Sequence, residues 1–159
     1  PDGRPEQEAF LADIWTIPAE KAKNGMETDV PLSNAVKRIL KKLKPITGKS
    51  KWVFESPRLK GKPLSSVKKT TEKIQEATSV SDFRLHDLRR TLITHMEEIL
   101  IDDKVIKKVV NHAAEGVTGK QYQWYNYNDK KLEALTRWSW RVQSIISSEK
   151  PKVKLHKVG

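Results

Sequence analysis

The chain has 159 residues, no cysteine and a formal net charge of +11, from 31 Lys/Arg against 20 Asp/Glu. This length supports one domain with a sizeable core, or one domain plus a tail. The lack of cysteine excludes a disulfide framework and a thiolate zinc site, and it agrees with a reducing compartment. No segment approaches the roughly 20 apolar residues of a membrane span, and no signal peptide is visible. The first residue is not methionine, so we expect a fragment of a longer protein or a processed chain.

The excess positive charge is concentrated in one block. Residues 37–73 contain thirteen Lys/Arg and only two acids, Glu55 and Glu72, whereas acids and bases balance in the rest of the chain. Such a block is typical of polyanion binding, in which released counterions drive association. The alternative is a lysine-rich surface that keeps the protein soluble. Charge by itself does not distinguish DNA, RNA and acidic lipid as partners.

The first predicted element is a β-hairpin over residues 14–31. Residues 14–17 are rich in strand formers, and Asn24-Gly25 is a strong signal for a two-residue turn. Ser33 is then expected to cap a helix that stops at Pro45. The side chains predicted for the buried face of this helix are Val36, Ile39, Leu40 and Leu43.

The next segment is predicted to contain a minor strand and a second helix. Residues 52–54 form a short apolar run before Ser56-Pro57, which favours a short strand. The second helix is expected to begin at Pro63 or Ser65 and to end near Ala77. Its predicted apolar stripe consists of Leu64, Val67 and Ile74.

Three further helices are predicted in the second half of the chain. One begins near His86, and one begins at Asp102-Asp103, whose negative charge suits a helix N-terminus. The last, capped by Asn128, follows a glycine-containing loop at residues 113–119. The residues predicted to be buried in these three helices are Leu88, Leu92, Met96 and Ile99, then Val105, Ile106, Val109 and Val110, then Leu132, Leu135, Trp138, Val142 and Ile145. The predicted fold class is therefore mainly α with a small β-hairpin (α+β), followed by a basic C-terminal tail at residues 147–159.

One set of polar residues suggests chemistry on a phosphodiester. The run His86-Asp87-Leu88-Arg89-Arg90-Thr91 is followed by Asn111-His112 and then by Tyr122. Histidine can transfer a proton near neutral pH, arginine can hold a phosphate with two N–H groups, and tyrosine can attack phosphorus. His86 and Arg89 are spaced i and i+3, so on a helix both can reach one pocket.

This set resembles the signature of the tyrosine recombinases, the phage-integrase family. The resemblance continues through Val109-Val110 and through the cluster from Tyr122 to Tyr127, and it covers residues 14–146. It implies a catalytic domain with a helical core, a small sheet and an active site that faces DNA. Residues 1–13 match the family poorly.

The resemblance also implies a role for each residue. Tyr122 would be the nucleophile, because the first tyrosine of the cluster carries the reaction in similar integrases; Tyr125 and Tyr127 are its competitors. Arg89 would clamp the scissile phosphate, while Arg90 would have a structural or backbone-contact role. His86 would donate to the phosphate or take the tyrosine proton, and His112 would be a second phosphate donor. His95 is interpreted as structural.

The hairpin would supply the acid for the departing 5′ oxygen. Lys23, immediately before Asn24-Gly25, resembles the hairpin lysine of the family, and Lys21 is the alternative. The family also has a catalytic arginine before the hairpin. Arg4 has a similar context, but it lies only eleven residues before Trp15. Either Arg4 fills this role or that arginine is missing.

No cofactor and no metal are expected. There is no phosphate-binding G-x-x-x-x-G-K-[ST] motif, and no H-E-x-x-H spacing. The predicted function is site-specific DNA recombination through a 3′-phosphotyrosyl intermediate. The expected partner is double-stranded DNA, bound by a homo-tetramer in the full-length family, and a cytoplasmic, DNA-associated location follows. The alternatives are a truncated remnant that only binds DNA or a protein, and a helical RNA-binding module.

Overall fold

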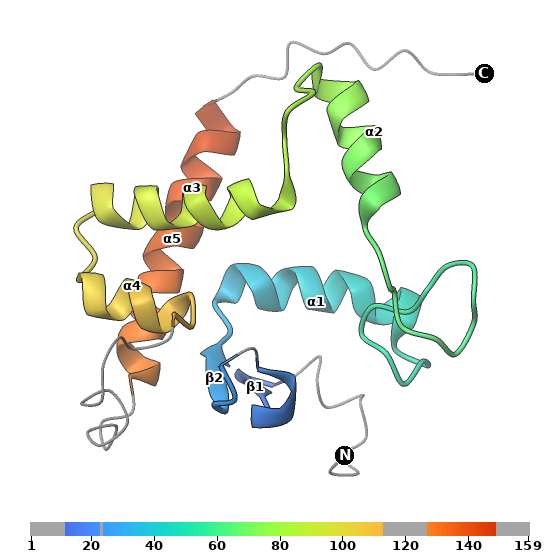
Figure 1. Ribbon diagram of the computed structural model, residues 1–159, viewed down its shortest axis with the longest axis horizontal. Coiled ribbons are helices and arrows are strands. Elements are labelled where there is room, and N and C mark those ends of the chain that lie inside the picture. The colour runs from blue at the N-terminus through green and yellow to red at the C-terminus, as the bar shows by residue number, and fades with distance from the viewer. Residues whose placement is uncertain (1–11, 23, 113–126, 149–159) are drawn as a thin grey trace.

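The computed structural model describes residues 12–22, 24–112 and 127–148 (Figure 1). The elements in chain order are β1 (Ile14–Ile17), the short 3₁₀ helix η2 (Ala19–Lys21), β2 (Thr28–Pro31), α1 (Asn34–Thr47), α2 (Lys68–Thr78), α3 (Leu85–Glu98), α4 (Asp103–Val109) and α5 (Asn128–Ser148). The described residues are mostly helical and include a two-stranded sheet, which confirms the expected α+β class. In the described part of the chain, no helix combines the length and the apolar character needed to cross a membrane.

The predicted hairpin is present, but its turn differs from the prediction. β1 and β2 pair antiparallel, with Ile14 opposite Pro31 and Thr16 opposite Asp29. Asn24-Gly25 does not close the hairpin as a two-residue turn, because residues 18–27 form a longer connection that includes η2. Gly25 has a φ of +65°, a conformation that glycine adopts without a Cβ clash. The connection therefore extends well beyond the paired strands.

Helix α1 begins where Ser33 predicted it, and it ends later than expected. Pro45 lies inside the last turn, and the helix continues to Thr47. The Ser33 hydroxyl does not cap the helix; it is buried and lies 2.9 Å from the Ser139 hydroxyl of α5. The predicted buried face is also wrong in part, since Ile39 is 62% exposed and Val36 39% exposed.

The hydrophobic core lies where α3, α4 and α5 meet. Met96 is fully buried and packs with Val105, Ile106 and Ala134. Partly buried side chains surround this cluster, namely Leu92, Ile93, Ile101, Val109, Tyr127, Leu135 and Trp138. Figure 1 shows α3 crossing in front of α5, with α4 below it. Helix α5 also contacts β2, so the same helix supports the core and the hairpin.

The segment between α1 and α2 is a loop rather than a strand. Residues 52–54 belong to no strand, and the pairing is a single bridge between Glu55 and Pro63. The Thr47 hydroxyl donates to the Val53 carbonyl at 2.8 Å, which joins this loop to the end of α1. A run of three apolar residues is too short to form a strand without a neighbouring strand to pair with.

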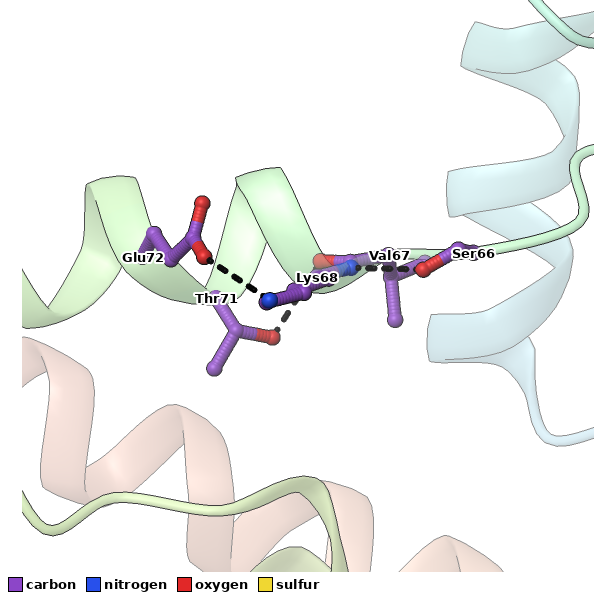
Figure 2. Close-up of polar contacts among 5 residues, drawn as sticks. All are labelled: Ser66, Val67, Lys68, Thr71 and Glu72. Atoms are coloured by element: carbon purple, nitrogen blue, oxygen red, sulfur yellow. Dashed lines mark hydrogen bonds and ion pairs between the residues drawn. The ribbon is translucent and has the colours of Figure 1, made fainter.

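Helix α2 begins at Lys68, later than predicted, and it stands apart from the other helices in Figure 1. Figure 2 shows its first turn, where the Lys68 amide donates to the Ser66 hydroxyl at 3.2 Å and Thr71 donates to the Val67 carbonyl. Lys68 also forms an exposed i,i+4 ion pair with Glu72 at 3.9 Å. The predicted apolar stripe is not buried, because Ile74 is 44% exposed and Leu64 and Val67 are exposed as well.

The last three helices match the predicted positions, with two errors in their buried faces. Leu88 of α3 is 56% exposed and Leu132 of α5 is 41% exposed, so neither belongs to the core. Lys131 and Ala134 are the buried residues of α5 instead. Asp102 caps α4 as predicted, because its carboxylate accepts a hydrogen bond from the Lys104 amide at 2.8 Å. The predicted loop at residues 113–119 and the tail beyond residue 148 lie outside the described residues.

Candidate active site

Arg89 reaches from α3 to the C-terminal end of α4. Its side chain is half-buried, and its Nη2 atom donates a hydrogen bond to the carbonyl of Val110, the residue that caps α4. The next residue, Arg90, is exposed and lies near Asp87, with 3.9 Å between the charged groups. The two neighbouring arginines therefore point in different directions, as their positions on a helix require. Arg89 alone is directed toward the end of α4.

The end of α4 has a defined geometry that places His112 just outside the helix. The His112 amide donates to the Lys107 carbonyl at 2.9 Å, and the Asn111 amide donates to the Lys108 carbonyl at 3.3 Å. Asn111 has a φ of +50°. This pair of bonds around a left-handed residue is the Schellman motif, in which asparagine replaces the more common glycine. The side chain of His112 is exposed to solvent at this helix end.

A third segment of the chain joins the same place. The Asn24 side-chain amide donates to the Asn111 Oδ1 atom at 2.9 Å, although the two residues are 87 positions apart. Asn24 directly follows the predicted leaving-group acid, Lys23, which itself lies outside the described residues. The hairpin connection, the end of α4 and Arg89 of α3 thus meet around residues 110–112. The alternative lysine, Lys21, is exposed at the end of η2.

His86 lies on the first turn of α3, one turn before Arg89, and its side chain is exposed. The start of this helix is held by Asp87, whose carboxylate accepts from the Arg84 amide at 2.9 Å. His95, further along α3, has a different environment. Its ring stacks on Trp138 with 5.8 Å between centroids, and its Nδ1 atom is 2.5 Å from Glu98. These contacts agree with the structural role predicted for His95.

A polar cluster joins the hairpin to the start of α5. Asp29 accepts from Thr16 at 2.7 Å and from Asn128 at 3.2 Å, and the buried ammonium of Lys131 donates to its backbone carbonyl. The Thr16 hydrogen bond lowers the pKa of the Asp29 carboxyl, with help from Asn128 and Lys131 and against the effect of burial. Burial lowers the pKa of Lys131, and the nearby Asp29 carboxylate opposes this shift. Neither Asp29 nor Lys131 was predicted from the sequence as part of any site.

Most of the sequence matches one known protein family. Residues 7–129, well over half of the chain, match the phage integrase family. The chain belongs to this family. It is 24% identical over 151 residues to the prophage integrase IntA of Escherichia coli strain K12. The match covers 92% of this chain but only 36% of that protein, so the chain spans about a third of the length of its relative. No solved structure gave a significant match.

The predicted site residues of this integrase-family chain fall into two groups. His86, Arg89 and His112 lie in the described part of the chain. The Arg89 side chain donates a hydrogen bond to the carbonyl of Val110, two residues before His112. Lys23, Tyr122, Tyr125 and Arg4 lie outside the described residues. The sequence interpretation overlooked Asn24 and Asn111 as contacts. The available signal was an asparagine directly after a predicted helix, where a left-handed residue is common. Among the described residues, no cluster of three or more His, Asp or Glu could hold a metal ion.

The positive block at residues 37–73, which we call the basic arm, comprises most of α1, the following loop and about the first half of α2 (Figure 1). Among the described residues, its only ion pairs are Lys37 with Asp13 and Lys68 with Glu72. Arg38, Lys41 and Lys42 are exposed on α1, and Lys51 lies over the ring of Trp52 at 5.1 Å. Most of the positive charge of the arm therefore has no acidic partner in the described part of the chain.

Proposed function

We propose that this chain is the catalytic part of a tyrosine-type site-specific DNA recombinase, with residues 14–146 adopting the catalytic fold of that family. One observation supports the proposal most strongly. Three segments that are remote in sequence converge on the end of α4, through the hydrogen bonds from Arg89 to Val110 and from Asn24 to Asn111. These segments carry or adjoin four of the five predicted catalytic residues.

The proposed reaction is a transesterification. The Tyr122 oxygen attacks the scissile phosphorus, its proton passes to a base such as His86, and the bond from phosphorus to the 5′ oxygen breaks. Lys23 gives a proton to the departing 5′ oxygen. Arg89 and His112 donate to the nonbridging oxygens, whose negative charge increases in the transition state. Rejoining reverses these steps, with the 5′ hydroxyl of a partner strand displacing Tyr122.

The basic arm would hold the DNA backbone beside this site. Each phosphate that a cation neutralises changes the slope of log affinity against log salt by about 0.9. Replacing Arg38, Lys41 and Lys42 with alanine should therefore lower the slope by up to about three and weaken binding of any duplex sequence. A matched variant with alanine at Lys104, Lys130 and Arg141 removes the same charge from outside the arm and should change the slope less. Equal effects of the two variants would argue against the arm as the binding surface.

The full protein would act as the family does, with four protomers on double-stranded DNA and further domains that recognise the recombination sites. Because this chain spans about a third of its relative, it should bind DNA by itself with little choice of sequence. The residues available in the chain would carry out the reaction without a cofactor, since the covalent intermediate conserves the energy of the phosphodiester bond.

The decisive experiment uses a duplex with a nick just beyond the cleavage site, from which the short product diffuses away and traps the covalent complex. We expect DNA attachment to the chain, with loss of attachment in Tyr122→Phe. Tyr125→Phe and Tyr127→Phe are the matched controls and should retain it. Attachment that survives in Tyr122→Phe but not in one of the controls would reassign the nucleophile. DNA binding without attachment at any protein concentration would favour the alternative, a remnant that binds DNA through the basic arm without cleaving it.

A further inference from the structure

The hydrogen bond between Asn24 and Asn111 joins the Asn24-Gly25 turn to the left-handed residue at the end of α4. Asn24 lies at the turn with Gly25, and its Oδ1 atom accepts from the Met26 amide at 3.2 Å. Its Nδ2 atom donates to Asn111 Oδ1 at 2.9 Å, in a partly buried contact. Both ends of the Asn24 side chain are therefore used, one within its own turn and one across the fold.

Asn111 occupies a position where glycine could adopt the same backbone conformation and form the same backbone hydrogen bonds. Its φ of +50° and the Schellman bonds require only a residue that tolerates the left-handed region. Asparagine is less favourable than glycine in this conformation, but it adds an amide that can form a specific contact. The side chain of Asn111 therefore contributes something that the helix end itself does not need.

The hairpin does not depend on this bond for its place in the fold. Asp29 on β2 is already joined to α5 through Asn128 and Lys131. Those contacts hold the strands, whereas Asn24 lies in the long connection beyond them. The Asn24–Asn111 bond joins this connection to the end of α4, next in sequence to the residue proposed as the leaving-group acid.

We propose that Asn24 and Asn111 are positioning residues, whose hydrogen bond holds the hairpin connection against the helix end that presents His112 and receives Arg89. The inference rests on the proposed function. Because Lys23 directly precedes Asn24, the bond would limit the distance between the Lys23 ammonium and a phosphate held by Arg89 and His112. Its loss would reduce protonation of the 5′ oxygen more than it reduces attack on phosphorus.

Asn111→Gly tests this directly, because glycine keeps the left-handed backbone and removes only the side chain. Single-turnover cleavage is measured on the nicked duplex and on the same duplex with sulfur in place of the scissile 5′ oxygen. A thiolate leaves without being protonated, so the sulfur substrate does not need the acid. We expect about a tenfold loss on the oxygen substrate, as for one hydrogen bond, and little loss on the sulfur substrate.

Two further variants complete the test. Asn24→Asp keeps the acceptor for Met26, and the Asn111 amide can turn to donate to the new carboxylate, so cleavage should stay near the wild-type rate. Asn24→Ala combined with Asn111→Gly should be no slower than the slower single variant, because both remove the same bond. Thermal unfolding of each variant shows whether the fold is intact.

Equal losses on both substrates, no loss in Asn111→Gly, or fully additive losses in the double variant would overturn the positioning role and leave the proposed function standing. Failure of the unaltered chain to form any covalent complex with the nicked duplex would overturn the proposed function and this inference together.

Discussion

Two arginines of this protein make the same kind of contact at different helix ends. Comparing their variants distinguishes an effect on fold stability from an effect on DNA cleavage. Arg89 donates to the carbonyl of Val110 at the end of α4, and Arg137 donates to the carbonyl of Ile99 at the end of α3. Both are half-buried, and both accepting residues cap a helix. Only Arg89 belongs to the proposed active site. Replacing each with methionine keeps most of the apolar stem and removes the charged donor.

The expected loss of stability is similar for the two variants. A hydrogen bond from a charged donor to a partly buried acceptor contributes about 1.5–3 kcal/mol. For a chain of this size, that corresponds to a fall in Tm of about 3–12 °C. The measurement is thermal unfolding followed by circular dichroism. The two helix ends should be destabilised to a comparable degree.

The expected effect on DNA cleavage differs strongly. Removing one donor that stabilises transition-state charge costs on the order of 10²–10³ in rate, or about 2.7–4 kcal/mol. Arg89→Met should therefore lose at least about a hundredfold in single-turnover attachment to the nicked duplex, well below its Tm. Arg137→Met should stay near the wild-type rate under the same conditions. If Arg89→Met cleaves as fast as Arg137→Met, Arg89 is only a helix cap and the phosphate clamp is refuted.

Three other outcomes test the fold and its electrostatics. Met96→Ala should destabilise the protein by about 2–5 kcal/mol, measured by urea unfolding, because Met96 is fully buried in the core; a smaller loss would mean that the core collapses around the cavity. Thr16→Val should raise the pKa of Asp29 toward its ordinary value of 3.8, measured by NMR titration, since the Thr16 hydroxyl is the main cause of the lowered pKa. In the unaltered protein, the ionised Asp29 carboxylate stabilises the fold at pH values above 3.8. This stabilisation is lost as the pH falls through the lowered pKa of the folded state. Burial lowers the folded-state pKa of Lys131 below its ordinary value of 10.5. Between the folded-state pKa and the unfolded-state pKa, the unfolded chain binds more protons, so the stability of the fold rises with pH in this range. Relative to the wild type, Lys131→Met should lose this rise, and unchanged pH dependence would argue against a buried ammonium.

The sequence by itself determined the secondary structure well where the pattern was long. The hairpin strands, the start of α1, and the helices α3, α4 and α5 lie where strand-forming residues, helical periodicity and helix-start signals predicted them. It also identified the family, because the order and spacing of His86, Arg89, His112 and Tyr122 can be read directly along the chain. These features can be read along the sequence one element at a time, so no tertiary information was needed.

Errors arose where a local pattern depended on a partner. The apolar residues in and just before α2 predicted a buried stripe, but among the described residues they are exposed, with Ile74 at 44% and Leu64 at 39%. Residues 52–54 have strand-forming side chains, but in the described part of the chain the pairing beside them is a single bridge between Glu55 and Pro63. Ser33 has the chemistry of a cap, yet its hydroxyl lies against Ser139, which is 106 positions away. Burial and hydrogen bonding are decided by the neighbours that the fold supplies.

The site shows the same division between local and tertiary information. The sequence predicted which residues would form the site, and it correctly placed His86 and Arg89 on one helix. Only the tertiary structure decided that Arg89 reaches the end of α4 and that Asn24 meets Asn111. These contacts join residues 21 and 87 positions apart, and their distances depend on how α3, α4 and the hairpin pack against α5. Periodicity describes one element at a time, whereas the relative position of two elements depends on the close packing of side chains from both.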